Sequence, residues 1–412
     1  MTISIGYAHK SVTPSLERPV FLAGFERNRR AESVHDDLSV RVLALQDQHS
    51  SLALVALDLI GLGRKISQAY REKLSALLPG LQLVLSCTHT HHGPDTLGLW
   101  GPEMLESGVD PAYMAFLEYQ VADAIQQAFS HLAPAALRAS SVHVPGIVKN
   151  IRDPHILDQE LTCIQYVDPD SNRVHLTLLN FPCHPETLHP DNRQITADYP
   201  HFLREQVECL TQADCLFFSG ALGGMMTPDV TEHSFEDAQQ IGVILAQAAV
   251  DSLSRQPPLQ LDGFQYDRVE YSTPLESPLL EQAMQANLVT DSVISRGYVI
   301  SEAGLLRLGQ VWLAHVPGEL LPALGLQLKH EMRAAGASVC GILGLANDEL
   351  GYILPDDKYH YPENPLDPGQ HYEETMSVGP SAGLSLIRVF DTLIHPNYLK
   401  ETSDGEVSNP GR

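Results

Sequence analysis

Short apolar runs alternate along the chain with longer amphipathic stretches, a pattern typical of α/β proteins. The apolar runs predict strands at 40–45, 52–59, 81–85, 174–181, 215–218 and 311–316. The amphipathic stretches predict helices at 65–78, 112–131, 199–210, 235–253, 320–335 and 381–394. Together they predict an α/β fold with a mixed β-sheet core flanked by helices.

The segment 235–253 carries the clearest helix signal. Ser234 precedes it as a capping residue, and Asp237 stands three positions later. An apolar stripe follows at helical spacing: Ile241, Ile244, Leu245 and Ala248. We therefore expect this helix to pack against the core.

The composition is that of a globular protein with a strongly acidic balance. The chain has 412 residues, 43% of them hydrophobic, which is enough for a large core. A formal net charge of -25 repels nucleic acids and anionic membranes, and the densest basic group, Arg27, Arg29 and Arg30, is too small to change this. The charge therefore argues against nucleic-acid binding.

The N-terminus has no charged segment followed by an apolar one, and nowhere do roughly 18 apolar residues run together. We therefore predict a cytoplasmic protein without an integral membrane segment. Six cysteines occur without Cys-x-x-Cys spacing, which favours buried thiols over a disulfide framework. Cys87 and Cys183 lie within two residues of candidate ligand histidines, so a thiolate ligand is an open alternative.

A histidine-rich segment, Ser-Cys-Thr-His-Thr-His-His-Gly-Pro, follows the strand predicted at 81–85. In an extended backbone, side chains two positions apart project from the same side. His89 and His91 would then face one point beyond the strand end, while His92 faces away. This arrangement suggests a metal site.

Two further candidate ligands also follow predicted strands. His184 comes shortly after the strand at 174–181, and Glu319 follows the strand at 311–316 at the start of a helical pattern. Sites in such folds collect at the carboxyl ends of strands. Two histidines and a carboxylate with one open position form a catalytic zinc set. Zinc lowers the pKa of bound water to about 7 and polarises a carbonyl, chemistry that suits hydrolysis of an amide or ester.

A glycine-rich loop, 219–228, follows the strand at 215–218. Such a loop allows close backbone approach and can present amide N–H groups to an oxyanion. It lacks the Gly-Lys-Ser/Thr ending of a nucleotide-binding P-loop, so we reject that interpretation.

These segments together resemble the catalytic N-terminal region of the neutral/alkaline non-lysosomal ceramidases, zinc-dependent amidases that cleave the N-acyl bond of ceramide. The resemblance spans most of the chain. It rests on Gly6, Val12-Thr13-Pro14, Val34-His35-Asp36, Leu38, Leu57-Asp58, Thr88-His89-Thr90-His91, Gly93-Pro94, Asn150, Arg152, Asn180-Phe181, His184-Pro185, Gly224, Thr227-Pro228, Pro317-Gly318-Glu319, Gly344-Leu345, Asn347, Gly351-Tyr352-Ile353 and Tyr372-Glu373.

The resemblance implies a set of site residues. The family's zinc ligands fall on His89, His184, Glu319 and Tyr352, and His91 would face the substrate. Its substrate-contacting arginine falls on Arg152 and its second tyrosine on Tyr372, while Tyr359 and Tyr361 compete for the tyrosine positions. Thr227 stands where the family's Gly-Asp-Val-Ser-Pro loop has serine.

Two departures from the family bear on the substrate. The loop reads Gly224-Met225-Met226-Thr227-Pro228, so an acidic residue is lost, and we expect no immunoglobulin-like C-terminal domain. We predict a zinc-dependent hydrolase that cleaves a linear N-acyl amide, with a small-molecule or lipid-like substrate other than ceramide. Because candidate residues come from both sides of a possible joint at 255–258, we expect one catalytic domain, 1–396, with a flexible tail, 397–412.

Less specific interpretations remain open at this stage. The histidines could be hydrogen-bonded core residues, Glu319 could belong to a helix start, and Tyr352 could be a packed aromatic. Arg152 could form a structural ion pair, and Thr227 could serve a turn. Residues near the ligands could support them: His35, Asp36, His189, Asp191 and Asp198. The functional alternatives are a zinc esterase and a metal-containing binding protein without turnover.

Overall fold

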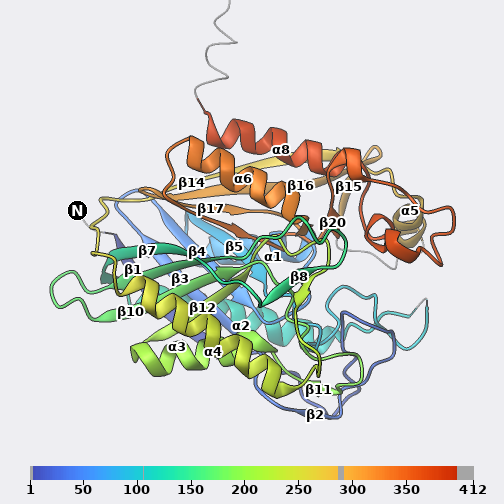
Figure 1. Cartoon of the computed structure of the whole chain (residues 1–412), viewed down its shortest axis with the longest axis horizontal. Coiled ribbons are helices and arrows are strands. Elements are labelled where there is room, and N and C mark those ends of the chain that lie inside the picture. The colour runs from blue at the N-terminus through green and yellow to red at the C-terminus, as the bar shows by residue number, and fades with distance from the viewer. Residues whose placement is uncertain (1–2, 105, 286–291, 397–412) are drawn as a thin grey trace, which may run out of the picture.

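A computed structural model describes residues 3–104, 106–285 and 292–396 (Figure 1). The tail expected at 397–412 lies outside the described residues, so that expectation stays a prediction. Within the described part of the chain, three larger sheets form the centre of the molecule. This arrangement confirms the predicted α/β class with a mixed sheet core flanked by helices.

The first sheet has the strand order β5-β4-β3-β1-β6. Its strands are β1 (Ser4–Ser11), β3 (Ser39–Gln46), β4 (Ser51–Leu57), β5 (Leu81–Cys87) and β6 (Ala133–Pro134). Strands β4 and β5 run parallel, and the other pairs are antiparallel. The carboxyl ends of β4 and β5 therefore lie at the same edge.

The second sheet has the order β12-β10-β9-β7, and the third has the order β14-β16-β17-β19 with β15 paired to β16. The second comprises β7 (Ala136–His143), β9 (Glu160–Val167), β10 (Val174–Phe181) and β12 (Asp214–Ser219). The third comprises β14 (Gln265–Pro274), β15 (Val293–Ser295), β16 (Tyr298–Leu308), β17 (Val311–His315) and β19 (Val339–Leu343). Strands β10 and β12 are parallel, as are β17 and β19.

Helices cover the outer faces of these sheets (Figure 1). On one side lie α2 (Pro111–Ser130), α3 (Tyr199–Thr211) and α4 (Phe235–Leu253), which contact the first two sheets. On the other lie α6 (Pro322–Ala334) and α8 (Ser381–Ile394) against the third sheet. Helix α1 (Arg64–Leu77) packs against β5, and α5 (Pro278–Gln285) and α7 (Tyr372–Thr375) are shorter.

Apolar side chains from all three sheets meet in a common core. Leu43 of β3, Leu178 of β10 and Leu313 of β17 belong to one buried cluster. Separate clusters lie between the sheets and the helix layers on either side. The sheets are therefore held against one another, which fixes the relative positions of their strand ends.

Short strand pairs complete the loops at one end of these sheets. They join β2 (Ser33–Val34) to β11 (Gln194–Ile195), β8 (Val148–Asn150) to β13 (Met226–Pro228), and β18 (Glu319–Leu320) to β20 (Tyr352–Ile353). The 3₁₀ turns η1 (Asp356–Lys358) and η2 (Gly369–His371) lie in the segment between β20 and α7.

Helix α4 begins and ends where the sequence predicted. The Ser234 side chain accepts a hydrogen bond from the Asp237 amide, and the Asp237 carboxylate accepts one from the Ser234 amide. Ile241 and Leu245 are buried, but the prediction for Ile244 was wrong because that side chain is 39% exposed.

The helix predicted at 320–335 begins later than expected. Residues Glu319 and Leu320 pair with β20 as strand β18, and α6 starts at Pro322. Proline suits the first helical position, where its missing N–H is not needed. Glu319 therefore lies on a short strand rather than at a helix start.

Five of the six cysteines are buried thiols and Cys209 is exposed. Burial raises the pKa of Cys87 and Cys183 well above its usual range, so both favour the neutral thiol. Among the described residues, no helix has the length and apolarity required to cross a membrane.

Candidate metal and catalytic site

Three histidines from two different sheets meet at the carboxyl ends of their strands. His89 and His91 follow β5, and His184 follows β10. One ligating atom of each lies within 4.8 Å of those of the other two, and all three side chains are buried. The ring centroids of His89 and His184 are 5.1 Å apart. These distances allow the imidazoles to share one ion.

The backbone reaches this arrangement differently from the extended segment that the sequence suggested. Strand β5 ends at Cys87, and His89 adopts a left-handed conformation with φ 69°. Such a conformation is strained for a non-glycine residue and persists only where its surroundings enforce it. The side chains of His89 and His91 still converge, with ring centroids 5.0 Å apart. His92 instead directs Nε2 to the carbonyl of His189, as expected for a residue that faces away.

Backbone carbonyls orient two of the imidazoles. His89 Nδ1 donates to Ile60 O at 2.6 Å, and His184 Nδ1 donates to Met226 O at 3.0 Å. Because each carbonyl accepts a proton from Nδ1, Nε2 is the nitrogen of both rings that faces the cluster. These hydrogen bonds fix the orientation of both rings.

Glu319 places a carboxylate between these rings. Its Oε2 atom lies 3.0 Å from His184 Nε2 and 3.5 Å from His89 Nε2. Strand β18 pairs with β20 so that Glu319 stands opposite Tyr352, and the Tyr352 hydroxyl is among the groups that lower the pKa of the carboxylate after His89 and His184. The structure thus brings together all four residues that the resemblance implied as ligands.

His91 is packed from behind and faces a second carboxylate. A Cβ atom at Gly24 would lie only 2.3 Å from His91 Cγ, so the glycine backbone touches the ring. His91 Nδ1 lies 3.2 Å from Glu186 Oε2, although the two atoms are not in line for a hydrogen bond. Within the described residues, neither ring nitrogen of His91 has a hydrogen-bond partner.

The protonation of the cluster follows from burial and from its carboxylates. Burial lowers the pKa of His89 to about 4 and that of His91 well below its usual range. Burial also opposes protonation of His184, but Glu186 and Glu319 outweigh it and raise its pKa to about 9. Burial would raise the pKa of Glu319, yet His89 and His184 hold it below its usual range.

These residues fit a divalent cation. Imidazole nitrogens held by backbone carbonyls, together with a buried carboxylate, form the donor set that zinc prefers. Burial raises the pKa of Tyr352 well above its usual range, and the Glu319 carboxylate adds to this. The phenol therefore stays protonated unless a cation lies beside it.

The glycine-rich loop passes directly beside Glu319. A Cβ atom at Gly223 would lie 2.6 Å from the Glu319 carbonyl oxygen, so only glycine fits there. Further along, Thr227 lies on β13, and its hydroxyl is a side-chain hydrogen-bond partner of Glu186. Thr227 therefore holds a carboxylate next to His91; its predicted contact with substrate stays a prediction.

Arg152 is bound by the protein itself. Its guanidinium contacts Glu373 at 2.6 Å, Glu374 at 2.7 Å and the carbonyl oxygen of Lys358 at 3.0 Å. The structural ion pair that the sequence left open is therefore present. A direct substrate contact by Arg152 stays a prediction.

A cleft of about 420 Å³ lies between the glycine-rich loop, the start of α6 and the segment that precedes α7. Tyr372 lines it, and the rings of Tyr372 and Tyr352 meet edge to face with centroids 6.1 Å apart. Met225 also lines the cleft, with its sulfur 3.6 Å from the Tyr352 hydroxyl. The two tyrosines thus connect the cleft to Glu319.

Comparison with solved structures places this fold. Over its whole length the chain superposes on 76% of the neutral ceramidase from Pseudomonas aeruginosa, with a TM-score of 0.79 and 17% identity. The chain shares the fold of neutral ceramidase. A ceramidase complexed with C2 gives a TM-score of 0.78 and 15% identity, with 100% of this chain and 77% of the other covered. No family model and no curated protein sequence matches the chain.

Sequence reasoning gave no role to two carboxylates near the histidine cluster, Glu186 and Asp58. Glu186 follows His184 by two positions, a spacing that could have drawn attention to it. Asp58 pairs with Arg204 at 2.8 Å and accepts from the Thr88 hydroxyl at 3.3 Å, which anchors the turn before His89. Asp58, Thr88 and Arg204 come from separate segments of the chain, so the local sequence pattern gave little indication of their contacts.

Asp198 and Asp36, which the sequence suggested as supports for the ligands, form hydrogen bonds within the surrounding loops. Asp198 accepts hydrogen bonds from the amides of Leu188 and Tyr199, which ties the segment after His184 to α3. Asp36 accepts from the Ala197 amide at 2.9 Å and lies 2.8 Å from His35 Nδ1. Both carboxylates hold loops rather than the histidine cluster itself.

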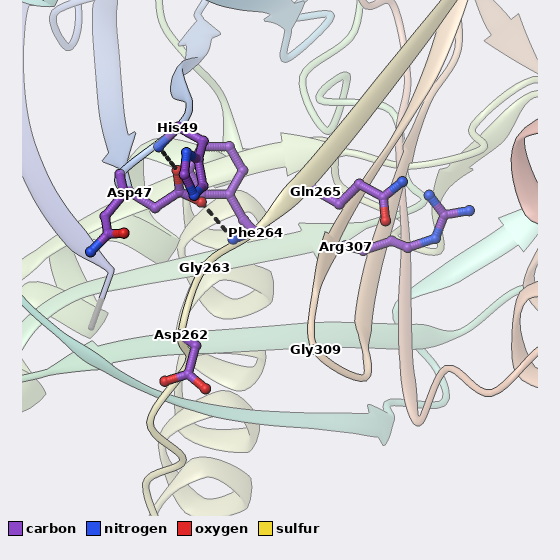
Figure 2. Close-up of a pocket in the computed structure, with 9 residues that line it drawn as sticks. Asp47, His49, Asp262, Gly263, Phe264, Gln265, Arg307 and Gly309 are labelled. Carbon is purple, nitrogen blue, oxygen red and sulfur yellow. Dashed lines mark hydrogen bonds between the residues drawn. The ribbon is translucent and has the colours of Figure 1, made fainter. Parts of the chain in front are cut away.

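A larger cleft of about 620 Å³ lies elsewhere, around the turn between β3 and β4 (Figure 2). Because β4 leads from this turn to the edge where the histidines lie, the cleft is at the opposite end of the strand. Asp47 accepts from the amides of His49 and Phe264, and Arg307 pairs with Asp267. These charged groups serve the turn and the sheet, so we assign no catalytic role to this cleft.

Proposed function

We propose that this chain is a zinc-dependent hydrolase that cleaves a linear N-acyl amide other than ceramide. The observation that carries the proposal is the meeting of His89, His184 and Glu319 around one buried point, on a fold shared with neutral ceramidase. The four proposed ligands are His89, His184, Glu319 and Tyr352.

The metal would act through chemistry that the side chains alone lack. When bound, Zn²⁺ polarises a carbonyl oxygen and lowers the pKa of a water ligand. The protein's contribution is to fix the donors in advance, through the carbonyls of Ile60 and Met226 and through the pairing of β18 with β20.

We assign proton transfer to His91. A proton on Nδ1 would face Glu186 Oε2, so Nε2 would be the nitrogen that accepts a proton from water and returns it to the leaving amine. Glu186 would orient the ring and stabilise its charged form, and Thr227 would hold Glu186.

Tyr372 is proposed as a hydrogen-bond donor to the oxygen that becomes negative during the reaction. Tyr372 is 45% exposed; its partial burial, with the carboxylates of Glu319 and Glu186 nearby, raises its pKa, so the phenol keeps its proton at neutral pH. Arg152 would act through Glu373 and Glu374, whose segment carries Tyr372.

The volume of the cleft, about 420 Å³, favours a small substrate over a long lipid. Its lining combines charged side chains such as Arg152 and Glu373 with apolar ones such as Ile151, Met225 and Leu321. A ceramide would need a long apolar groove for its two hydrocarbon chains. The cytoplasmic location remains a prediction from the sequence.

A substrate panel tests the proposal. Purified zinc-loaded protein would be assayed against short N-acyl amides and the matched esters, with His89→Ala as the active-site variant and His49→Ala as an exposed control. We expect amide hydrolysis that His89→Ala abolishes and His49→Ala leaves unchanged. Turnover of esters alone, or hydrolysis unaffected in His89→Ala, would overturn the assignment.

A further inference from the structure

Glu373 is a buried acid with one oxygen unused. Its side chain lines the cleft beside Tyr372 and is 3% exposed. Oε2 accepts a hydrogen bond from Arg152 Nη1 at 2.6 Å, but within the described residues Oε1 has no partner. Native proteins rarely leave a buried carboxylate oxygen unpaired, and such groups often mark a place where a ligand completes the pairing.

Glu374, the neighbouring acid, differs from Glu373 in its hydrogen bonds. Glu374 is fully buried, and both of its oxygens are occupied. Oε2 accepts from Arg152 Nη1, and Oε1 accepts from Arg152 Nη2, the His360 amide and His371 Nδ1. Glu374 therefore ties Arg152 to the segment between β20 and α7, whereas Glu373, a residue of the cleft lining, leaves one buried acceptor without a partner among the described residues.

Arg152 itself has little capacity left for a substrate anion. Each of its terminal nitrogens already makes two hydrogen bonds, to the two acids and to the carbonyl oxygen of Lys358. Burial, with the carboxylates of Glu319 and Glu374, raises the pKa of Glu373 to about 7 despite the Arg152 guanidinium. A further anion beside this acid would be disfavoured, whereas a hydrogen-bond donor would favour its ionised form.

Resting on the proposed function, we infer that Glu373 determines specificity by accepting a hydrogen bond from a hydroxyl or ammonium group on the substrate. Glu373 directly follows Tyr372, whose ring contacts that of Tyr352, and the charge of Glu319 is close enough to act on Glu373, so the donor group would lie close to the scissile amide. The substrate class is a small N-acyl amine that carries a hydrogen-bond donor on its amine portion.

Three isosteric probes test the inference: N-acetylethylenediamine, N-acetylethanolamine and N-propylacetamide. They place an ammonium, a hydroxyl or a methyl group at the same position. Dissociation constants would be measured by ligand-observed NMR on zinc-loaded protein, and hydrolysis rates would be measured separately. We expect at least one donor-bearing probe to bind about tenfold more tightly than the methyl probe, equivalent to about 1.4 kcal/mol.

Two substitutions of Glu373 distinguish an ammonium donor from a hydroxyl donor on the substrate. Glu373→Gln keeps an acceptor oxygen without charge, so it should remove a preference for ammonium and keep one for hydroxyl. Glu373→Leu should remove both preferences. Glu363→Gln, at an exposed acid of the same connecting segment, serves as the control and should leave binding unchanged. Thermal unfolding would show that each variant is folded.

Equal binding of the three probes to the wild-type protein would overturn the inference, as would a donor preference that survives in Glu373→Leu. Binding that depends on Glu373 without any hydrolysis would refute the proposed function while supporting the recognition site. Hydrolysis of all three probes at equal rates with equal affinities would refute the recognition site while supporting the proposed function.

Discussion

Replacement of Gly24 by alanine would displace His91 without touching a proposed metal ligand. Gly24 has φ +95°, and a Cβ atom there would lie 2.3 Å from Cγ, 2.6 Å from Cβ and 2.7 Å from Nδ1 of His91. No real Cβ atom approaches another heavy atom this closely, so the imidazole or the backbone must move. Because the three nearest atoms all belong to the His91 side chain, Gly24→Ala tests His91 separately from His89 and His184.

The size of the effect can be worked from two contributions. A non-glycine residue in a left-handed conformation costs about 1–2 kcal/mol. Overpacking against a buried ring costs about 1–3 kcal/mol more. For 412 residues, an unfolding entropy of about 2.1 cal/mol/K per residue gives about 0.9 kcal/mol/K, so the two contributions lower Tm by about 2–6 °C. A shift of about 1 Å in a catalytic group can reduce the rate about 100-fold.

Gly80→Ala is the matched control. Gly80 has φ +80°, but nothing lies within 4 Å of a Cβ atom built there. The control therefore carries the backbone strain without the collision. Amide hydrolysis, zinc content and Tm would be measured for both variants. We expect Gly24→Ala to lose about 100-fold in kcat/KM with its zinc retained, and Gly80→Ala to lose only stability. Equal activity in the two variants would refute the reasoning, and loss of zinc from Gly24→Ala would place His91 among the ligands.

Two further outcomes follow from the buried carboxylates. Glu186→Gln should keep zinc but reduce hydrolysis about 10–100-fold, because the ring of His91 loses its charged neighbour. Normal hydrolysis rates in the zinc-loaded variant would show that Glu186 has no part in the mechanism. Burial opposes ionisation of Glu302, but Arg71, His315 and Arg64 outweigh it and lower its pKa from 4.5 to about 2. This acid therefore stabilises the fold above about pH 4.5 by up to about 3 kcal/mol, and that contribution is lost as the pH falls toward 2. Denaturant unfolding between pH 5 and pH 2 should show a shallower loss in Glu302→Gln, and an identical slope in both proteins would contradict the assignment.

The sequence predicted best those elements whose order of apolar and polar residues follows directly from which side chains are buried. Helix α4 alternates a buried and an exposed face, and β10 ends in a continuous buried run. Other strands gave no such pattern because polar side chains occupy them. Strand β9 buries Thr162 and Gln165, and β14 consists mainly of exposed and half-buried residues. Their strand character depends on neighbours that only the assembled sheets provide.

The candidate site divides in the same way. His89 and His184 could be proposed from local sequence because each follows an apolar strand, but it is the packing of two separate sheets that brings those strand ends together. Tyr352 was implied by resemblance alone, since its position depends on the pairing of β18 with β20. Glu374 could not be assigned to Arg152, because the two lie 222 positions apart and no local spacing records their contact.

The most direct test of the central claim is the metal content of the purified protein and of His184→Ala, measured by inductively coupled plasma mass spectrometry after dialysis against trace zinc. The account predicts about one zinc ion per wild-type chain and much less in His184→Ala, while His49→Ala keeps the wild-type content. Wild-type protein that stays free of zinc, or a His184→Ala variant that binds as much zinc as the wild type, would contradict it.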